Sequence, residues 1–486
     1  MEKNTFDVII VGAGISGINA AYRLQQTLPD YSYAILDGKS RLGGTWDQFK
    51  YPGIRSDSDL FTFGLPWEPW QHDRAIAEGK DILSYLECAA TKYEIDMHFK
   101  FGHMVLSMDW SSSNQLWKLE VTVGGERRYL HARHVLLGTG YYDYKRGLNT
   151  AIEGIEKFQG TVVHPQFWPE DLNYVDKRVV VIGSGATAVT LLPSMADKVK
   201  SITMLQRSPG YFVRIPIVDP LVTLIKRWLP LKWANPMIRM MYFTRAIIFY
   251  NFCRMFPERM INFLRKNTER QLPEHLPYDP HFKPKYNPWE QRMCICPGGD
   301  FFDCLRSGKA HVVTDTINTV TESGIKLDSG AELDADIIVT ATGLKVQFGG
   351  AIKLSVDGTP VNVPDKFIWR GIMLQDVPNL AFVFGYTNQS WTLGADAAAQ
   401  LWVRLLKRAH SRGMNSAIPR VDAKDGVREK FIMDLLSSSY AKAAKEANVL
   451  PKGGDRGPWL PRRLWLKDIL HAKYGDISTG LQLVRI

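Results

Sequence analysis

Three glycines near the start of the chain have the spacing of a phosphate-binding turn. Gly12, Gly14 and Gly17 follow a short apolar stretch and precede a segment with helical periodicity. In such a turn the first glycine permits a tight bend, the second lets the backbone approach a pyrophosphate, and the third allows close packing of helix on strand. The N–H groups that begin the helix would bind the phosphates. The turn therefore predicts a dinucleotide site, with Asp37 at the end of the next strand placed to bind ribose hydroxyls.

A second turn of the same kind lies near the middle of the chain, with Ala188 in place of the third glycine. The strand that follows it ends in Arg207 and Ser208, where the first site has an acid. A guanidinium and a hydroxyl match a 2′-phosphate through charge-assisted hydrogen bonds, whereas an acid would select the free 2′-hydroxyl of NAD. We therefore predict that the second site binds NADPH, the alternative being that Arg207 is a solvated surface charge. The turn and the start of its helix comprise Gly183, Ser184, Gly185, Ala186, Thr187, Ala188 and Val189.

Two dinucleotide sites in one chain indicate a flavin that is reduced by a nicotinamide cofactor. A disulfide reductase would also need a Cys-x-x-Cys pair, and the spacing of Cys294 and Cys296 does not match one. The sequence shows no other redox centre, and no metal site is expected. The cofactors are therefore predicted to be FAD and NADPH, and the reduced flavin is expected to react with O2 directly.

Two longer patterns carry a resemblance to a known family. Residues 158–169 read F-x-G-x-x-x-H-x-x-x-W-P, and residues 43–57 match G-G-x-W-x4-[FY]-P-G-x3-D. Both patterns, and their order relative to the two glycine turns, are similar to those of type I Baeyer–Villiger monooxygenases over essentially the whole chain. The stretches GGTWDQFKYPGIRSDSD, IGSGATAVTLLP and YNPWEQRMC most resemble the branch that contains the ethionamide-activating monooxygenase.

The resemblance implies an enzyme that uses NADPH and O2 to convert ketones into esters or lactones through a C4a-peroxide of the reduced FAD. It also implies oxygenation of sulfides and thioamides at sulfur. One alternative is a flavin-containing monooxygenase restricted to nitrogen and sulfur, against which Trp168 and Pro169 argue. Another is a non-catalytic, flavin-binding redox sensor, against which the retained charged site residues argue.

The resemblance also implies roles for single residues. Arg292 would be the arginine that stabilises the negatively charged peroxide, and Asp57 would orient it. His164 would act as a linker and hinge between domains more than as a general base. Many relatives carry Lys directly before the active-site arginine, but this chain has Gln291, so recognition of the 2′-phosphate would rest more heavily on Arg207.

The predicted cofactor contacts combine the glycine turns with the family patterns. For FAD they are Gly12, Gly14, Ser16, Gly17, Asp37, Gly44, Thr45, Trp46, Asp47, Gln48, Asp57 and Val105. For NADP they are Arg55, Ser56, Asp57, Gly183, Ser184, Gly185, Ala186, Thr187, Ala188, Val189, Arg207 and Ser208.

The elements around these motifs predict an α/β fold with two doubly wound, Rossmann-like dinucleotide-binding domains. Each turn lies between a strand and a helix, and a second strand follows, which implies parallel strands joined by right-handed crossovers. We expect an FAD domain from residues 1–145 and 340–486, and an NADP domain from residues 150–210 and 288–339. A helical subdomain at residues 211–287 would interrupt the NADP domain.

Composition and charge limit the remaining possibilities. The chain of 486 residues has a net charge of +10, and residues 211–285 hold thirteen Lys and Arg against five Asp and Glu. No nucleic-acid-binding module accompanies this charge, so a nucleic-acid partner is not expected. The apolar and aromatic residues of the same segment favour a small apolar ketone or sulfide as substrate. They are also compatible with the core of a helical subdomain, and with peripheral contact to an anionic membrane through residues 211–285.

The location and assembly of the protein are only weakly constrained by the sequence. The N-terminal stretch does not read as a signal peptide, and no apolar run of about 18 residues would span a membrane. The five cysteines have no regular spacing, which argues against a secreted disulfide framework. The cytoplasm is the expected location, and the oligomeric state stays open.

Overall fold

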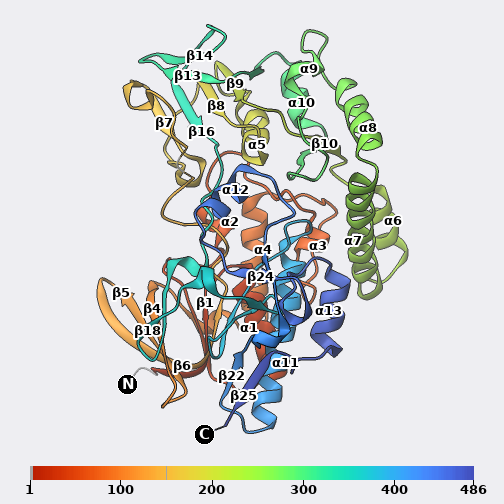
Figure 1. Cartoon of the computed structure of the whole chain (residues 1–486). Helices are drawn as coiled ribbons and strands as arrows, with labels where there is room; N and C mark the ends of the chain where they lie inside the picture. The colour runs from red at the N-terminus through yellow and green to blue at the C-terminus, as the bar shows by residue number, and fades with distance from the viewer. Residues whose placement is uncertain (1–3, 149, 486) are drawn as a thin grey trace.

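The structure is a computed structural model that describes residues 4–148 and 150–485, and a larger mixed sheet and a smaller parallel sheet dominate it (Figure 1). In the larger sheet, β1 (Thr5–Val11) runs parallel to β2 (Tyr33–Leu36) on one side and to β6 (Glu126–Leu137) on the other. The remaining strands of this sheet are β3 (Phe99–Lys100), β4 (His103–Ser111), β5 (Leu116–Val123), β17 (Lys353–Val356), β18 (Thr359–Pro360), β19 (Ile368–Trp369), β20 (Met373–Leu374) and β21 (Leu380–Phe382).

The second sheet contains five strands, and every adjacent pair in it is parallel. Its order is β12 (Ala310–Thr314), β9 (Ser201–Gln206), β8 (Arg178–Ile182), β16 (Ile337–Thr340) and β7 (Thr161–Val163). The strands predicted before and after each glycine turn are all present. The α/β class with two Rossmann-like sheets is thereby confirmed.

Smaller sheets border the two main ones. A three-stranded sheet is made of β13 (Ile317–Val320), β14 (Gly324–Leu327) and β15 (Glu332–Asp334). Three strand pairs complete the set: β10 (Phe212–Ile215) with β11 (Cys294–Pro297), β22 (Ser416–Pro419) with β25 (Leu481–Val484), and β23 (Glu429–Phe431) with β24 (Lys452–Gly454).

Helices cover the sheets and form a separate group at one side of the molecule. The helices associated with the sheets and the cleft are α1 (Ile15–Thr27), α2 (Thr45–Gln48), α3 (Leu60–Phe63), α4 (Gly79–Lys92), α5 (Ala186–Met195), α10 (Asp300–Arg306), α11 (Trp391–Ser411), α12 (Ser439–Glu446) and α13 (Trp465–Tyr474). The group at the right of Figure 1 is α6 (Pro220–Trp228), α7 (Leu231–Met255), α8 (Pro257–Glu269) and α9 (Tyr278–His281).

The start of the expected helical subdomain differs from the prediction. Residues 212–215 form β10, which pairs in parallel with β11 from beyond the helices. Phe212, Val213 and Ile215 are aromatic or β-branched, which suits a strand. The strand β11, which pairs with them, is distant in sequence. Within the described residues, no helix is long and apolar enough to cross a membrane.

The core of the larger sheet explains why the first glycine turn has its sequence. Helix α1 buries Ile18, Ala21 and Leu24 against the sheet and also packs along α11. A Cβ at Gly17 would lie 1.9 Å from the carbonyl oxygen of Gly12. Only glycine therefore lets α1 approach β1 this closely, and that approach sets where the helix N-terminus points.

Candidate active site

A cleft of about 1740 Å³ is lined by both glycine turns and by loops that follow the parallel strands. Ligands of open α/β folds bind at this edge, because the carboxyl ends of the strands and the helix N-termini meet there. The cleft lies where the two sheets face each other, so a single cavity contains both predicted cofactor sites.

The first turn has the geometry of a pyrophosphate cradle. Gly12 adopts φ +110°, and a Cβ there would lie 2.6 Å from the carbonyl oxygen of Gly138. Helix α1 begins at Ile15, with no acidic residue in its first turn to compete with a phosphate for the N–H groups. The carboxylate of Asp37 accepts the N–H of Ala13 at 2.8 Å, which holds it beside the turn. These features fit an FAD pyrophosphate and ribose.

The second turn repeats this arrangement. Gly183 adopts φ +128°, and a Cβ there would lie 2.4 Å from the carbonyl oxygen of Ala341. A Cβ at Gly185, by contrast, would meet no atom of the described residues within 4 Å. The hydroxyl of Ser184 donates to the carbonyl of Ser208 at 2.9 Å, which ties the loop carrying Arg207 to the turn. The open space before Gly185 fits a second pyrophosphate.

Arg292 provides a fixed cation in the cleft. Its Nη1 lies 3.7 Å from Oδ2 of Asp57, and its Nη2 donates to the carbonyl oxygen of Tyr386 at 3.2 Å. Burial by itself lowers the pKa of Arg292, but Asp57 and the Tyr440 and Tyr141 hydroxyls outweigh it and raise that pKa above its ordinary value. The guanidinium is therefore charged, and it is held from two directions where it borders the cleft.

Most of the predicted contact residues line the cleft. From the FAD set these are Gly12, Gly14, Ser16, Asp37, Gly44, Thr45, Trp46, Asp57 and Val105. From the NADP set they are Asp57, Gly183, Ser184, Gly185, Ala186, Thr187, Arg207 and Ser208. The Ser16 hydroxyl also accepts a hydrogen bond from Trp391 Nε1 at 2.9 Å. Of the remaining predictions, Gly17, Ala188 and Val189 are buried in α1 or α5, behind the turns.

Four further predicted contacts are engaged with other protein groups. Asp47 pairs with Lys39 at 3.4 Å and also with Arg41. Gln48 donates to the carbonyl of Gln166 at 3.1 Å, and Ser56 donates to that of Ser58 at 2.7 Å. Arg55 forms an ion pair with Asp300. None of these four is among the described residues that line the cleft, so their cofactor contacts stay predictions.

His164 directly follows β7 and lies against Gly147, which belongs to the connection between β6 and β7 that joins the two sheets; it is not among the described residues that line the cleft. Its Nδ1 accepts the N–H of Gln166 at 3.2 Å, and a Cβ at Gly147 would lie 2.5 Å from its Nε2. Burial lowers the pKa of His164, so the ring is neutral at pH 7. A neutral ring packed on backbone suits the expected hinge role, which stays a prediction.

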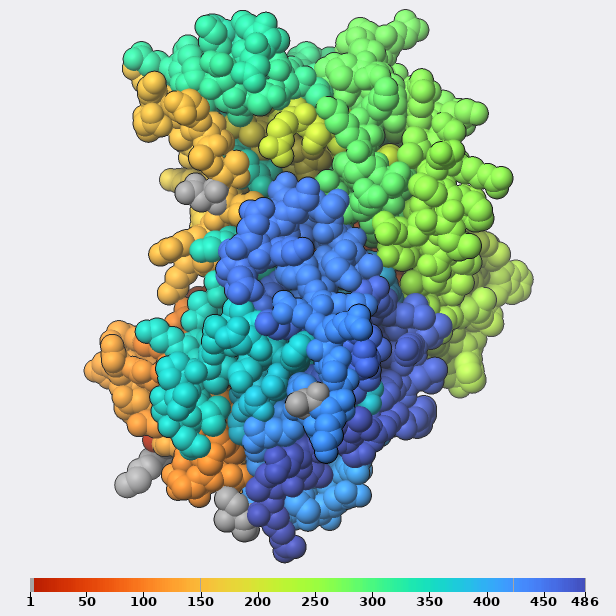
Figure 2. Space-filling model, viewed as in Figure 1, coloured from red at the N-terminus to blue at the C-terminus, as the bar shows by residue number. Residues whose placement is uncertain are grey.

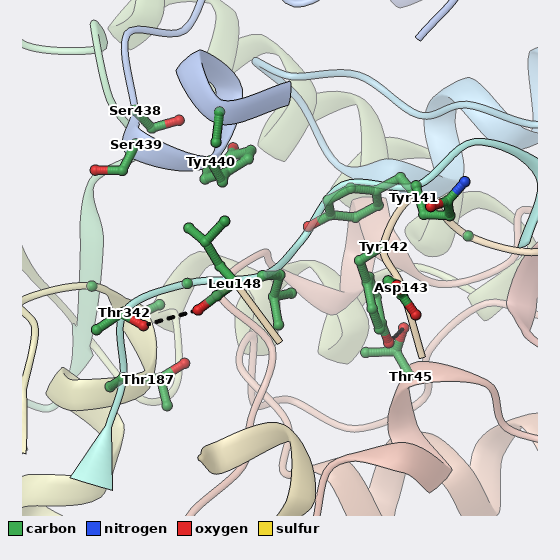
Figure 3. Close-up of a pocket in the computed structure, with 18 of the residues that line it drawn as sticks. Thr45, Tyr141, Tyr142, Asp143, Leu148, Thr187, Thr342, Ser438, Ser439 and Tyr440 are labelled. Atoms are coloured by element: carbon green, nitrogen blue, oxygen red, sulfur yellow. Dashed lines mark hydrogen bonds between the residues drawn. The ribbon is translucent and has the colours of Figure 1, made fainter. Parts of the chain in front are cut away.

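Several residues that the sequence analysis missed also line the cleft (Figure 3). Tyr141 stacks on Trp391 with ring centroids 5.2 Å apart, and the Tyr142 hydroxyl donates to Thr45 Oγ1 at 2.9 Å. Thr342 donates to the carbonyl of Leu148 at 3.4 Å. A signal was available, since Gly138-Thr-Gly140 and Ala341-Thr-Gly343 each follow a short apolar stretch. Other cleft residues of this kind are Tyr144, Ser438, Ser439 and Tyr440.

The chain shares this architecture and much of its sequence with known proteins. The family model described as pyridine nucleotide-disulphide oxidoreductase matches residues 9–216. An oxidized steroid monooxygenase bound to NADP has a TM-score of 0.78 at 20% identity, covering 99% of this chain and 100% of that one. Cyclohexanone monooxygenase from Rhodococcus sp. Phi1 has a TM-score of 0.76 at 19% identity, covering 100% of both chains. These two likenesses concern the fold.

The sequence similarity goes further than the fold. The FAD-containing monooxygenase EthA of Mycobacterium tuberculosis is 44% identical over 481 residues, which is 99% of this chain and 98% of that protein. The aligned region of 481 residues spans nearly the whole chain and is not limited to one of the two sheets. Two dinucleotide cradles that open into one cleft are the arrangement such an enzyme needs, and the chain belongs to the family of FAD-containing monooxygenases.

Proposed function

We propose that this protein is an FAD- and NADPH-dependent Baeyer–Villiger monooxygenase that converts small apolar ketones into esters or lactones with O2. The observation that carries the proposal is the position of Arg292, a held guanidinium in a cleft shared by two dinucleotide cradles. The 44% identical relative is named for its FAD, and the related folds include a cyclohexanone monooxygenase bound to NADP+. When bound, FAD accepts hydride from NADPH and activates O2 for transfer to the substrate.

The residues of the chain supply binding, orientation and charge. Arg292 stabilises the negative charge that develops on oxygen as the carbonyl is attacked, because a fixed cation does not have to reorganise during the reaction. Asp57 orients Arg292 through Nη1, while the carbonyl oxygen of Tyr386 accepts from Nη2. Tyr141 and Trp391, stacked at the cleft wall, exclude water from the reacting groups.

The residues that follow β2 and β9 determine which dinucleotide each site binds. Asp37, held by the N–H of Ala13, binds the ribose hydroxyls of FAD. Arg207, held near the second turn through the contact of Ser184 with Ser208, binds the 2′-phosphate of NADPH. Asp47, Gln48, Arg55 and Ser56 stay proposed cofactor contacts, because they adjoin the cleft residues Trp46 and Asp57 in the sequence.

The proposed division of the chain follows the two sheets. Residues 1–145 and 340–486 make the FAD domain, and residues 150–210 and 288–339 make the NADP domain. Residues 1–3 and 486 of the first domain lie outside the described residues. The helical subdomain at residues 211–287 then contains α6–α9, and its first strand, β10, ties it to β11 of the NADP domain. We place the enzyme in the cytoplasm, as the sequence analysis expects.

The deciding experiment measures NADPH consumption by the FAD-loaded protein with and without an aliphatic methyl ketone, with products identified by mass spectrometry. An ester one oxygen atom heavier than the ketone is the expected product. Sulfides and thioamides are tested in parallel, because the same cleft accepts a soft sulfur atom. Oxygenation of sulfur without any ester would overturn the Baeyer–Villiger proposal and leave a heteroatom monooxygenase.

A further inference from the structure

The outer face of helix α7 is apolar although it faces solvent. Its exposed apolar residues are three, four or eight positions apart, so they lie on one side of the helix. They are Trp233, Met237, Met240, Ile248, Phe252 and Met255, with exposed fractions of 64, 50, 43, 63, 40 and 69%. A surface helix normally turns its apolar side inward, so this stripe requires a separate explanation.

The inner face of α7 is already packed, so the stripe does not result from an undocked helix. Ala234, Ile238 and Cys253 are buried. Phe243 packs against Trp465, with ring centroids 4.8 Å apart. Arg239 donates to two backbone carbonyls of the segment around α3, at 3.0 and 2.8 Å. The helix is therefore held in place with its apolar stripe outward.

The turn between α6 and α7 extends the apolar surface. Trp228 is 73% exposed, and Leu229 and Leu231 are also exposed. Leu221 and Leu224 lie on the same side of α6 as Trp228, at helical spacing, and are exposed as well. Figure 2 shows this pale-green group protruding at the right edge of the molecule. Two exposed tryptophans at a protruding turn match the side chains that settle at the interface between water and lipid.

The positive charge of α6 and α7 indicates which kind of partner this surface could bind. Residues 220–257 contain no Asp or Glu, and their six basic residues are Lys226, Arg227, Lys232, Arg239, Arg245 and Arg254. Arg227, Lys232 and Arg254 are exposed beside the apolar stripe. Two copies of this surface would place like charges against each other, which opposes self-association. An anionic bilayer accepts both features, with apolar side chains at the acyl boundary and cations at the headgroups.

We propose that α6 and α7 form a docking surface for an anionic lipid bilayer, with Trp228 and Trp233 entering the interface. The surface is displayed by helices fixed to the rest of the protein, so docking needs no refolding. The proposal is independent of the reaction, because none of its residues lines the cleft in the part of the chain that the structure describes.

The test uses the full FAD-loaded protein and vesicles of phosphatidylglycerol and phosphatidylcholine in equal parts. At low salt the protein is expected to sediment with these vesicles, and not with phosphatidylcholine alone. Replacing Trp228→Ser and Trp233→Ser together is expected to weaken binding at least tenfold, while FAD content and thermal melting stay unchanged. Absence of sedimentation with the anionic vesicles at low salt would overturn the proposal.

Two double variants that each lose two positive charges distinguish a defined docking surface from general electrostatic attraction to the membrane. Arg227→Gln with Lys232→Gln is expected to raise the dissociation constant about 30-fold, since two basic residues near an anionic surface are lost. Lys157→Gln with Lys353→Gln removes the same charge from exposed positions outside α6 and α7, and should leave binding unchanged. An equal loss in both pairs would contradict a defined surface. Sedimentation equilibrium gives a second check. A dimer that is absent in the double tryptophan variant would also contradict the proposal, because a second copy of the chain would then cover this face.

Discussion

Arg292 and Asp57 come from distant parts of the chain, yet Nη1 of the arginine lies 3.7 Å from Oδ2 of the aspartate. Asp57 follows the segment that begins near the FAD cradle, and Arg292 precedes β11. Their pairing therefore joins the two halves of the cleft at one point. The guanidinium also donates to the backbone of Tyr386 and so has little freedom to leave the cleft wall.

Removing the Arg292 guanidinium should slow oxygen transfer to the ketone and leave the reduction of the flavin by NADPH nearly unchanged. We expect Arg292→Ala to lower the turnover of a ketone about 10²- to 10³-fold, by analogy with the loss of an oxyanion-stabilising donor. Reduction of the bound flavin by NADPH, followed by rapid-mixing absorbance, should change only slightly. Arg292→Lys is the matched control, because it keeps the charge while losing the second contact. An equal loss of flavin reduction would mean that Arg292 chiefly binds the nicotinamide cofactor.

Arg207 should decide between the two nicotinamide cofactors. Arg207→Gln is expected to raise the KM for NADPH about 10- to 100-fold, as expected for losing a hydrogen bond to a charged group. The KM for NADH should stay the same, because NADH has no 2′-phosphate. Lys200→Gln, an exposed position before the opposite end of β9, serves as the control. Steady-state kinetics with both cofactors make the comparison, and parallel losses for NADH would argue against phosphate recognition.

The two glycines of the second turn should respond differently to alanine. Gly185→Ala is expected to fold and melt normally and to keep FAD, since its Cβ meets nothing nearby in the described residues. The added methyl fills the space for the pyrophosphate, so NADPH binding should weaken. Gly183→Ala should instead lower the melting temperature, because its Cβ would lie 2.4 Å from the Ala341 carbonyl oxygen. Thermal melts and titrations with NADPH test this, and normal NADPH affinity in Gly185→Ala would contradict the assigned cradle.

His134 should make the stability of the fold sensitive to mild acid. Burial lowers the pKa of His134 to about 4, whereas the unfolded chain has the ordinary value near 6.5. Between these values the unfolded state binds a proton that the folded state does not, so stability falls as pH drops from about 6.5 towards 4. The loss should approach about 3 kcal/mol at the low end. Urea unfolding at pH 7 and pH 5 measures it, with His134→Gln as the variant in which this part of the pH dependence should disappear.

The local features of both glycine turns were determined by sequence alone. Tight bends with positive φ need glycine, and apolar stretches of the right length form the strands on either side. The strand ends at Asp37 and Arg207 could therefore be placed, and with them the predicted preference of each site. The Gly43–Asp57 pattern and the residues before Cys294 likewise indicated that Asp57 and Arg292 belong to one site.

Tertiary structure decided the features that depend on distant partners. Asp47 and Gln48 lie within a matched pattern, but Asp47 pairs with Lys39 and Gln48 donates to the carbonyl of Gln166, and neither is among the described residues that line the cleft. Tyr141 lines the cleft and stacks there on Trp391, which is distant in sequence. Residues 212–215 became a strand because β11 lies beside them. The apolar spacing of α7 is equally suited to a buried helix, and only the packing of its opposite face shows that the stripe faces outward.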